Sequence, residues 1–461
     1  MTSVPRAEQL ATLGRITHEL FVSDETGRLL DELRPYEEDL PPDSDEASLI
    51  RVTRRDWEKA RRVPPDLRAE MSRAASLALP VWVEARQTSD YSLFRPHLEK
   101  NLELRLRYID CFDGYDEPYD VLLDDFERGM TSAEVRAVFD RLKEEQIPLV
   151  AAASRNGDRP ARDRRFPLEQ QQRFELVVLE RFGFDRRSWR LDPTVHPFAS
   201  SIGIDDIRLT TRYHQTNLDG LFASMHECGH GLYEHGVSRE LERTPLARGT
   251  SLGMHESQSR LWENLVGRSR PFWSFFYPQL QEHFPEALDD VALDEWFASV
   301  NWVQPSFIRV EADEATYNLH VILRFELEQE LIGGEVGLDE LPEVWNDRMQ
   351  RYLGVEPPED RLGVLQDMHW AAGHIGYFST YALGNVISAQ IWERVTEELP
   401  DVYEQFGEGE FGPLRDWLKE HLYRHGRKFT PKETLERLVG GGLDAEPYLR
   451  YLSGKLASLP R

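Results

Sequence analysis

The chain has 461 residues, of which 40% are hydrophobic and 11% aromatic, a composition that supports a large buried core and excludes disorder over most of the length. Acidic residues outnumber basic residues by 82 to 55, and the formal net charge of −27 disfavours nucleic acid and anionic membranes as partners. Two cysteines, Cys111 and Cys228, are too few for a disulfide framework, and no run approaches the roughly 20 apolar residues that cross a bilayer. We therefore expect a globular, cytoplasmic protein without a signal peptide.

Helix-like periodicity is the dominant pattern of the chain. Thr131 and Glu134 have the spacing of a capping box, and apolar residues follow at helix spacing from Val135 to Leu142. Another apolar series precedes Gly183, a residue suited to ending a helix. These patterns predict one helix that begins near residue 131 and a second that ends near residue 183.

Three stretches interrupt the helical pattern. Residues 36–46 are rich in proline and acidic side chains, and residues 154–165 are rich in glycine, proline and arginine, so both are expected to be exposed loops. Residues 206–211 have the two-residue period of a strand instead. In this stretch Asp206, Arg208 and Thr210 alternate with Ile207, Leu209 and Thr211. The alternation predicts a small β-sheet.

The clearest motif is His226-Glu227-Cys228-Gly229-His230, inside a segment of helical periodicity from Asn217 to His235. Because the histidines are four residues apart, both imidazoles lie on one helix face and reach a single zinc ion. Glu227 lies about 100° further round the helix and can contact a water on that ion. Such a carboxylate can take a proton from the acidified water and pass it to a leaving amine, which is metal-assisted amide hydrolysis.

A chance match on an ordinary amphipathic helix is the alternative explanation of this motif. Gly229 and Gly231 argue against it, because each costs roughly 1 kcal/mol relative to alanine in a helix interior and so calls for a packing or functional reason. Cys228 is turned about 200° from the histidines and is expected to pack in the core rather than bind the ion. The motif therefore predicts a metal-dependent hydrolase.

The third metal ligand is not selected by pattern alone. A catalytic zinc has three protein ligands and one open position, and five downstream residues qualify by type: Glu234, Glu242, His255, Glu256 and Glu263. An apolar helical stripe from Met254 to Leu265 has Glu256, Ser259 and Glu263 on its opposite face. This pattern favours a solvated surface, although the wall of a cleft would look the same.

Six separated segments share their order and content with one known family. They are His196-Pro197-Phe198, Asp206 to Thr210, His226 to His230, His255-Glu256-Ser257-Gln258, Ile308 to Asp313 and Gly363 to Trp370. Together they resemble the signature blocks of the thermostable (Taq-type) metallocarboxypeptidase family. Residues 6–10 and 376–378 also look like this family, so the resemblance covers most of the chain.

The resemblance implies His226, His230 and Glu256 as metal ligands and Glu227 as the general base and acid. It implies a mostly α-helical zincin fold, related to the neurolysin-type peptidases, with a deep substrate groove and a small β-sheet beside the metal-binding helix. One catalytic domain over residues 1–461, with its core at about 191–390, and a homodimer are expected. The chain begins where the first helical segment of the family has passed, so an element that covers part of the groove is expected to be absent.

A carboxypeptidase must bind the free carboxylate of its peptide, and a planar guanidinium does this through two hydrogen bonds. Arg309 and Arg208 lie in two of the resembling segments, and we expect Arg309 to anchor the carboxylate and Arg208 to line the groove. The structural alternatives are ion pairs of Arg309 with Asp313 and of Arg208 with Asp206. The strand at residues 206–211 is expected either to pair with extended substrate or to be a structural edge strand.

The tetrahedral intermediate of amide hydrolysis needs a hydrogen-bond donor in addition to the metal. Tyr377 and Tyr381, one turn apart on an expected helix, are the leading candidates, with His369 and His374 as alternatives. Each is explained equally well as a core aromatic or a buried histidine. Asp367 is a candidate to orient a metal-ligand imidazole.

Two other functions compete with a broad-specificity carboxypeptidase that acts on peptides. A metallo-oligopeptidase or endopeptidase would not depend on a terminal carboxylate. A non-catalytic, zinc-containing peptide-binding protein belongs to a different class, and Glu227 argues against it because a structural zinc site has no use for a base. The sequence thus predicts a metallocarboxypeptidase with zinc as its ion, and the same ligands also accept cobalt or manganese.

Overall fold

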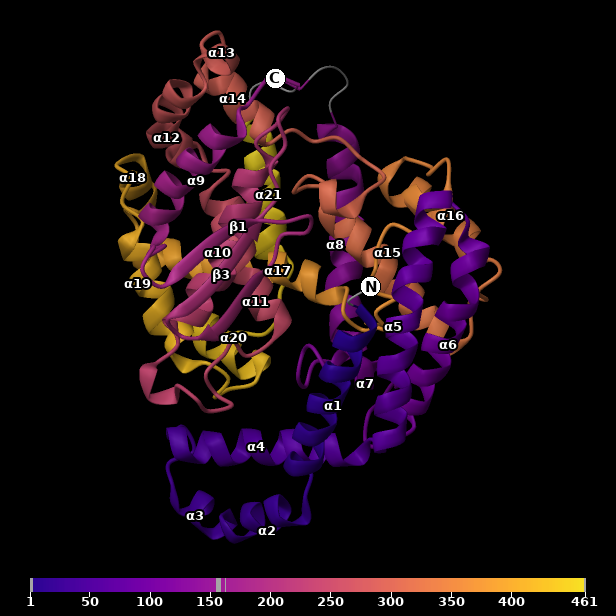
Figure 1. The fold of residues 1–461 in the computed structure, drawn as a ribbon. Coiled ribbons are helices and arrows are strands. Elements are labelled where there is room, and N and C mark those ends of the chain that lie inside the picture. Colours follow the sequence, from indigo (N-terminus) through magenta and orange to yellow (C-terminus); the bar gives the residue numbers. More distant parts are fainter. Residues whose placement is uncertain (1–2, 155–158, 162, 460–461) are drawn as a thin grey trace. The chain divides into compact units, whose positions relative to one another are not determined.

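The computed structural model describes residues 3–154, 159–161 and 163–459, and these form two compact units, each built from separate stretches of the chain. Unit 1 is drawn from residues 1–135, 306–312 and 319–379, and unit 2 from residues 136–305, 313–318 and 380–461. Most described residues are helical, and the predicted mostly α-helical fold is confirmed (Figure 1). Within the described residues no helix is long and apolar enough to span a membrane.

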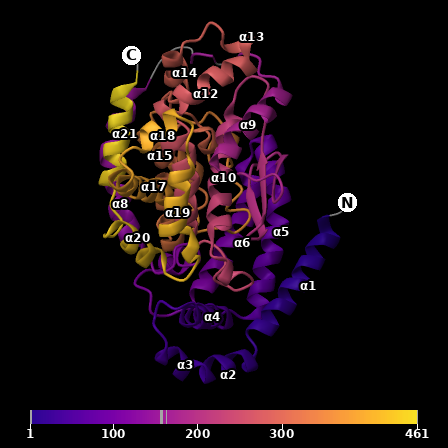
Figure 2. The same cartoon turned by 90° about the vertical axis from the view of Figure 1, so that its left-hand side faces the viewer.

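The regular elements in the described part of unit 1 are helices. Its N-terminal stretch holds α1 (Ser3–Phe21), α2 (Asp24–Glu32), α3 (Arg34–Asp39), α4 (Asp45–Arg62), α5 (Pro65–Thr88), α6 (Tyr91–Ile109) and α7 (Pro118–Leu123). Its later stretches hold η3 (Arg309–Glu311), nearly all of α15 (Tyr317–Gly333), α16 (Leu341–Leu353) and η4 (Asp360–Leu362). The long helices α5 and α6 pack along each other (Figures 1 and 2).

The loop predicted at residues 36–46 is only partly correct. Tyr36 lies inside α3, and α4 starts at Asp45 after Ser44, whose side chain accepts a hydrogen bond from the Ala47 amide at 3.2 Å. Asp45 and Glu46 lie in the first turn of α4, where they complement the positive end of the helix dipole, whereas Asp39 is the last residue of α3. In the second predicted loop, residues 155–158 and 162 lie outside the described residues, and the described residues of 159–165 contain no helix or strand.

Two helices begin and end where the sequence predicts. At the start of α8 (Ser132–Ala153), the Thr131 hydroxyl accepts from the Glu134 amide at 3.2 Å, and the Glu134 carboxylate accepts from the Thr131 amide at 3.0 Å. The next helix, α9 (Leu168–Phe182), ends at Gly183, whose φ of 127° is a conformation that side-chain-bearing residues avoid. Both predictions are confirmed.

A three-stranded sheet in unit 2 comprises β1 (Trp189–Pro193), β2 (Ala199–Gly203) and β3 (Asp206–Thr211) in the order β1-β3-β2. β1 pairs with β3 in parallel and β2 pairs with it antiparallel. Ile207, Leu209 and Thr211 are the buried side of β3, as their alternation predicts. Because β3 is hydrogen-bonded on both edges, the predicted pairing of this strand with substrate, and its alternative as an edge strand, are both wrong.

The other regular elements in the described part of unit 2 are helices. These include α10 (Asp219–Gly236), η1 (Arg239–Leu241), α11 (Leu252–Arg260), the π-helical η2 (Leu261–Val266), α12 (Arg270–His283), α13 (Pro285–Leu288), α14 (Leu293–Val300), α17 (Ser379–Glu398), α18 (Val402–Gly407), α19 (Gly412–His421), η5 (Tyr423–His425), α20 (Pro431–Val439) and α21 (Glu446–Ser458). α10 is central, since it packs against β2, β3, α9 and α11. Both views show α10 beside the sheet (Figures 1 and 2).

Candidate metal centre

Two glycines allow α10 to approach its neighbours closely. A Cβ on Gly229 would lie 2.5 Å from the carbonyl oxygen of Gln258, so only glycine permits the α10 backbone to come this near to α11. A Cβ on Gly231 would lie 2.7 Å from the indole of Trp189 in β1. These close contacts are the packing reason for a glycine at both positions. The contact of Gly229 brings α10 against α11, the helix that carries Glu256.

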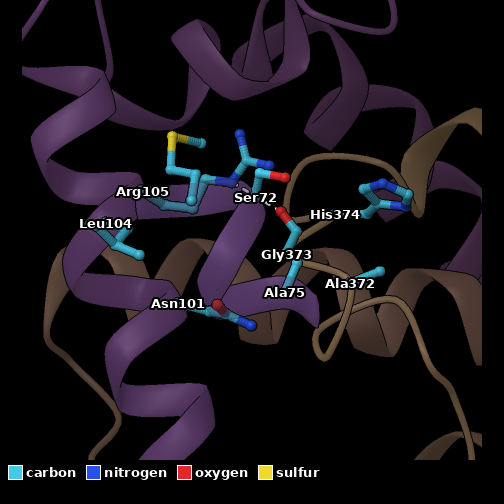
Figure 3. Close-up of a pocket in the computed structure, with 9 residues that line it drawn as sticks. Ser72, Ala75, Asn101, Leu104, Arg105, Ala372, Gly373 and His374 are labelled. Atoms are coloured by element: carbon cyan, nitrogen blue, oxygen red, sulfur yellow. Dashed lines mark hydrogen bonds between the residues drawn. The ribbon is translucent and has the colours of Figure 1, made fainter. Parts of the chain in front are cut away.

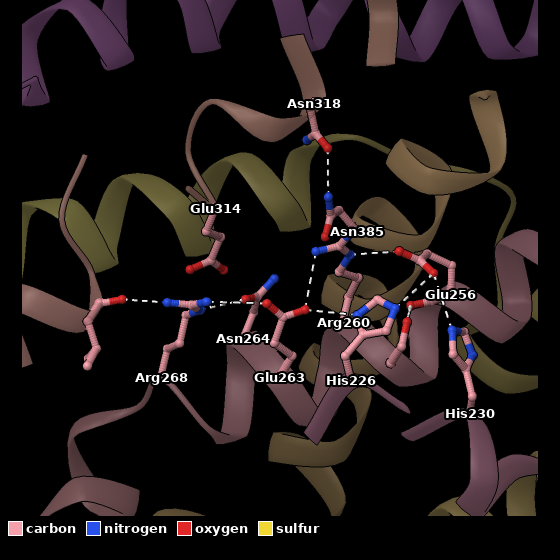
Figure 4. A network of polar contacts seen from close by, with 12 residues as sticks. His226, His230, Glu256, Arg260, Glu263, Asn264, Arg268, Glu314, Asn318 and Asn385 are labelled. Atoms are coloured by element: carbon pink, nitrogen blue, oxygen red, sulfur yellow. Dashed lines mark hydrogen bonds and ion pairs between the residues drawn. The ribbon is translucent and has the colours of Figure 1, made fainter. Parts of the chain in front are cut away.

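Three potential ligand atoms converge between α10 and α11. The Nε2 atoms of His226 and His230 lie 3.6 Å and 3.5 Å from Oε2 of Glu256, and the ligand atoms of all three residues lie within 4.8 Å of one another. Tetrahedral ligands with bonds of about 2.0–2.1 Å are separated by about 3.3 Å, so the cluster has nearly the required size. Figure 4 shows both imidazoles turned toward the glutamate.

Glu256 reaches this position on a helix that is polar on a buried face. Ser251 caps the start of α11, and its hydroxyl accepts a hydrogen bond from the Met254 amide at 3.1 Å. Glu256 is 4% exposed, Ser259 is fully buried, and the Glu263 side chain is 12% exposed. The prediction that this polar face is a solvated surface is therefore wrong, because the face meets α10 and not water. Glu263 lies in the π-helical turn, a distortion that often occurs at functional sites.

Each histidine of the cluster has a partner for its other ring nitrogen. His226 Nδ1 lies 2.9 Å from Oε2 of Glu263, so a proton on Nδ1 leaves Nε2 as the metal-binding lone pair. This is the carboxylate–histidine arrangement that orients metal-binding imidazoles in many metal sites. His230 Nδ1 lies 2.9 Å from Nδ1 of His255, whose Nε2 lies 2.6 Å from Oε1 of Glu234. Glu263 thus holds the His226 imidazole directly, and Glu234 holds the His230 imidazole through His255.

Two arginines hold the carboxylates. Arg260, buried and one turn beyond Glu256, donates from Nε to Oε1 of Glu256 at 2.8 Å and from Nη1 to Oε2 of Glu263 at 3.2 Å. Arg268 reaches Oε1 of Glu263 at 3.3 Å. Arg260 Nε thereby occupies one oxygen of Glu256 and leaves the other facing the imidazoles (Figure 4).

The pKa values divide the three carboxyl groups of the site into two kinds: those of Glu256 and Glu263 are lowered, and that of Glu227 is raised. Burial opposes ionisation of Glu256 and Glu263, yet the Arg260 and His226 charges outweigh it and hold the pKa of Glu256 well below its usual range and that of Glu263 at about 2. Burial raises the pKa of Glu227 to about 7. Glu227 forms no hydrogen bond or ion pair with any described residue. Its carboxylate is therefore suited to accept a proton from water.

The structure also places Cys228 and the other candidates for the third metal ligand. Cys228 is completely buried, and burial raises the pKa of its thiol, so it packs in the core as predicted. Of the other candidates for the third ligand, Glu242 is exposed. Glu263 and His255 lie at hydrogen-bond distance from His226 and His230, and Glu234 contacts His255. Their types were recognisable from the sequence, but their role behind the imidazoles was not.

Arg309 belongs to a second cluster of charges, in unit 1. It is 4% exposed and donates from Nη2 and Nε to Oδ1 of Asp367 at 2.8 Å and 3.1 Å, while Arg324 donates to Oδ2 at 2.6 Å. The predicted alternative partner, Asp313, instead accepts from the amides of Gln304 and Ala315. The role predicted for Asp367 is wrong, because its two oxygens bind two arginines and no ligand imidazole.

Arg208 forms the ion pair with Asp206 that was its predicted structural alternative. Its Nε and Nη2 lie 2.8 Å and 2.9 Å from the carboxylate of Asp206 on the same strand, and both side chains are about half exposed. An exposed pair of this kind contributes little to stability.

The four oxyanion candidates fall on different elements. Tyr377 precedes α17 and stacks with His374 at 5.9 Å, so the prediction that Tyr377 and Tyr381 share a helix is wrong; only Tyr381 lies on α17. Tyr381 contacts Tyr317 in unit 2. His369 is partly buried, and desolvation lowers its pKa to about 3, so its ring is neutral at ordinary pH.

A histidine pair on a helix, a glutamate from the next helix and an unpaired carboxylate beside them define a metallopeptidase type of site. The sequence pattern of the family described as Carboxypeptidase Taq (M32) metallopeptidase matches residues 2–456. Thermostable carboxypeptidase 1 of Thermus thermophilus is 41% identical over 469 residues, covering 98% of this chain and 91% of that protein. Carboxypeptidase 1 of Bacillus subtilis is 38% identical over 461 residues, covering 99% and 92%.

Solved structures agree with these relatives. The M32 carboxypeptidase of Deinococcus radiodurans R1 superposes with a TM-score of 0.94 at 40% identity, covering 99% of this chain and 92% of that one. A metallocarboxypeptidase 1 of Trypanosoma cruzi has a TM-score of 0.91 at 30% identity, covering 98% and 92%. The chain belongs to the M32 metallopeptidase family and is a metallocarboxypeptidase that uses a divalent metal ion.

Proposed function

We propose that the protein removes C-terminal residues from peptides with broad specificity, and that zinc is its ion, held by His226, His230 and Glu256. The convergence of the three ligand atoms carries this proposal, since two imidazoles and one carboxylate with a free fourth position are the donor set of hydrolytic zinc. Cobalt or manganese would accept the same donors. A divalent cation held there supplies Lewis-acid chemistry, acidifying a water and polarising the scissile carbonyl.

Glu227 is the proposed general base and acid. Its carboxylate accepts the proton of the attacking water and then delivers it to the nitrogen of the leaving amino acid. Its pKa of about 7 and its lack of a hydrogen-bond partner among the described residues support both steps. Tyr377 and Tyr381 are the proposed donors to the oxyanion, with His369 and His374 as alternatives.

Arg309 is the proposed anchor for the C-terminal carboxylate of the substrate, and Arg208 a groove-wall residue. Asp367 holds the Arg309 guanidinium in one orientation, which supports a fixed bidentate contact with substrate. The exposed ion pair of Arg208 gives that residue less support.

Peptide cleavage followed by mass spectrometry tests the proposal. A short unblocked peptide should lose residues stepwise from its C-terminus, and a chelator should stop the loss. The same peptide with a C-terminal amide should be cut far more slowly, because it has no carboxylate to bind. Equal rates for the acid and the amide would favour the metallo-oligopeptidase alternative instead.

A variant separates catalysis from metal binding. Glu227→Gln should lower kcat by about 10²–10⁴-fold while the protein keeps its metal, because the carboxamide removes the base and leaves all three ligands. Full activity in this variant would refute the role of Glu227. Bound metal without any peptidase activity in the unaltered protein would favour the non-catalytic peptide-binding alternative.

We further propose a single catalytic domain in a cytoplasmic homodimer. The chain alternates between the two units over residues 306–319, which supports one inseparable domain rather than two. A homodimer is supported by exposed apolar side chains on neighbouring N-terminal helices, among them Leu13, Leu20 and Leu29. Light scattering of the protein and of Leu20→Glu tests it, and a variant with unchanged mass would argue against this surface.

A further inference from the structure

A small cavity in unit 1 lies between α5, α6 and the loop at residues 372–374, apart from the residues assigned to metal binding. It has a volume of about 160 Å³ and contains one cationic side chain, Arg105 (Figure 3). The loop that closes it is well fixed, because the amides of Ala372, Gly373 and His374 each donate to a carbonyl oxygen of residues 368–370. The cavity is therefore a built feature of the fold.

Arg105 differs from the buried arginines of the molecule. Arg260, Arg309, Arg324 and Arg348 each form an ion pair with a carboxylate. Arg105 donates from Nε to the carbonyl oxygen of Gly373 at 2.7 Å, and within the described part of the chain no carboxylate pairs with it. Burial accordingly lowers its pKa from the ordinary value. Arg105 is itself only partly buried, and a partly desolvated guanidinium without a counter-ion is a costly arrangement that an anion would relieve.

The nearest acidic groups are engaged elsewhere. Asp125 accepts from the Tyr108 hydroxyl at 2.8 Å and pairs with Lys59 at 2.7 Å. Glu328 accepts from Trp370, Gly376 and Tyr119. Both raise the pKa of Arg105 only through longer-range attraction. The Arg105 guanidinium lies over the Tyr108 ring at 5.6 Å, and its Nη1 and Nη2 groups have no carboxylate partner among the described residues, so they remain available to a ligand.

The other lining residues narrow the class of ligand. Met71, Ala75, Leu104 and Ala372 supply apolar surface. Asn101 is already committed, because its amide nitrogen donates to the carbonyl oxygens of Trp370 and Ala371 at 2.8 Å and 3.2 Å. Ser72 is the remaining hydroxyl of the lining, and no acidic residue is present to accept an ammonium group. This combination suits a single negative charge on a short hydrocarbon body and disfavours a zwitterionic amino acid.

We propose that this cavity binds a small monocarboxylate, with the ligand carboxylate on the Nη groups of Arg105 and its hydrocarbon part against Leu104 and Ala75. The size of the cavity suits an acid of about four carbons. The lining contains none of the proposed metal ligands, and its one residue with a proposed catalytic role is His374, an alternative donor to the oxyanion.

Methionine methyl groups report on this site without an activity assay. The chain has seven methionines, and Met71 lines the cavity. Met368 instead adjoins Asp367, which together with Arg309 and Arg324 forms the arginine cluster. In protein labelled with ¹³C at the methionine methyls, titration with sodium butyrate should shift the Met71 signal saturably, the signal being assigned with Met71→Leu. Butyramide, of the same shape but uncharged, should bind at least about tenfold more weakly, because a charge-assisted hydrogen bond is replaced by a neutral one.

Matched variants identify the cation. Arg105→Gln should abolish the shift of the Met71 signal, and Arg107→Gln, two residues along the same helix, should leave it intact because Arg107 is exposed and paired with Glu70. The proposal is overturned if Met71 does not respond to butyrate, or if it responds equally to butyramide. A shift confined to Met368 would assign the carboxylate to the arginine cluster and also overturn it. The acid and amide comparison stands even if Arg105→Gln fails to fold.

Discussion

The candidate metal centre of unit 2 and the arginine cluster of unit 1 each keep a carboxylate ionised, but in different surroundings. In each, a buried carboxylate is ionised because a guanidinium lies beside it: Arg260 beside Glu256, and Arg309 and Arg324 beside Asp367. Both carboxyl groups accordingly have a pKa well below the usual range, in spite of burial. Charge pairing therefore does not by itself distinguish a metal ligand from the counter-ion of an arginine.

The two clusters differ in how the chain assembles them. Glu256, Arg260 and Glu263 occupy successive turns of one helical segment, so their spacing alone brings them together. Asp367 is 58 residues from Arg309 and 43 from Arg324 along the chain, and only the folding of unit 1 brings the three together. In the first cluster one carboxylate oxygen faces two imidazoles, whereas in the second both oxygens bind arginines. This difference predicts that only the first cluster responds to loss of a carboxylate by losing metal.

Removal of Glu256 should have the largest effect. Glu256→Ala deletes the third donor and also leaves the buried Arg260 with one carboxylate fewer, so we expect loss of stoichiometric metal and of essentially all peptidase activity. Metal content after gel filtration and turnover of an unblocked peptide measure both. Glu242→Ala is the matched control, because Glu242 is exposed and should tolerate the change. Normal metal content in Glu256→Ala would remove this residue from the ligand set.

Substitution in the arginine cluster should affect substrate and not metal. Arg309→Gln should lower kcat/KM for a free-acid peptide about 100-fold, the value of a lost charge-assisted pair of hydrogen bonds, at unchanged metal content. The rate for the amidated peptide should change little, so the preference for the acid should shrink. Arg208→Gln, which breaks an exposed pair, is expected to change kcat/KM much less. An unchanged preference in Arg309→Gln would show that another residue binds the carboxylate.

The groups behind the ligands should have intermediate effects. Glu263→Gln removes the carboxylate that orients His226, and we expect metal affinity to fall about 10–100-fold. Asp367→Asn is the corresponding change in the other cluster and should leave metal affinity unaltered. Competition with a metal-sensing dye measures both dissociation constants. Equal losses in the two variants would contradict the distinction between the clusters.

Glu175 is a buried carboxyl group without an arginine partner. Its substitution should have the smallest effect on activity, but a clear effect on how the free energy of unfolding depends on pH. Burial raises the pKa of Glu175 to about 8, although the Tyr213 hydroxyl donates to it at 2.7 Å. Because the folded pKa lies above the unfolded value of about 4.5, the stability that this group contributes is complete below pH 4.5 and is lost as pH rises toward 8.

Glu175→Gln cannot ionise and should remove this loss. Between pH 5 and pH 8 the free energy of unfolding of the variant should gain about 3–4 kcal/mol relative to the unaltered protein. Urea denaturation at the two pH values measures the difference. Glu263, whose pKa is lowered to about 2, has the opposite sign and contributes its stability above pH 4.5. A difference that does not depend on pH would mean that Glu175 is ionised in the folded protein throughout this range.

Local spacing in the sequence determined a large part of this protein. The i and i+4 histidines, the alternation of residues 206–211, the capping box at Thr131 and the glycine after α9 all predict structure correctly, because each depends on contacts within one element. Gly229 and Gly231 could be recognised as costly in a helix, and their cost signalled close packing before the packing partners were known.

Only the tertiary structure decided which polar groups meet. Whether the face of Glu256 and Glu263 met water or α10, and whether Arg309 paired with Asp313 or with Asp367, depended on segments far apart in the chain. The central place of β3 in its sheet and the π-helical turn that carries Glu263 likewise follow from packing, not from residue type. Periodicity shows which side of an element is polar, but burial and partners are properties of the assembled fold, since they depend on what lies opposite.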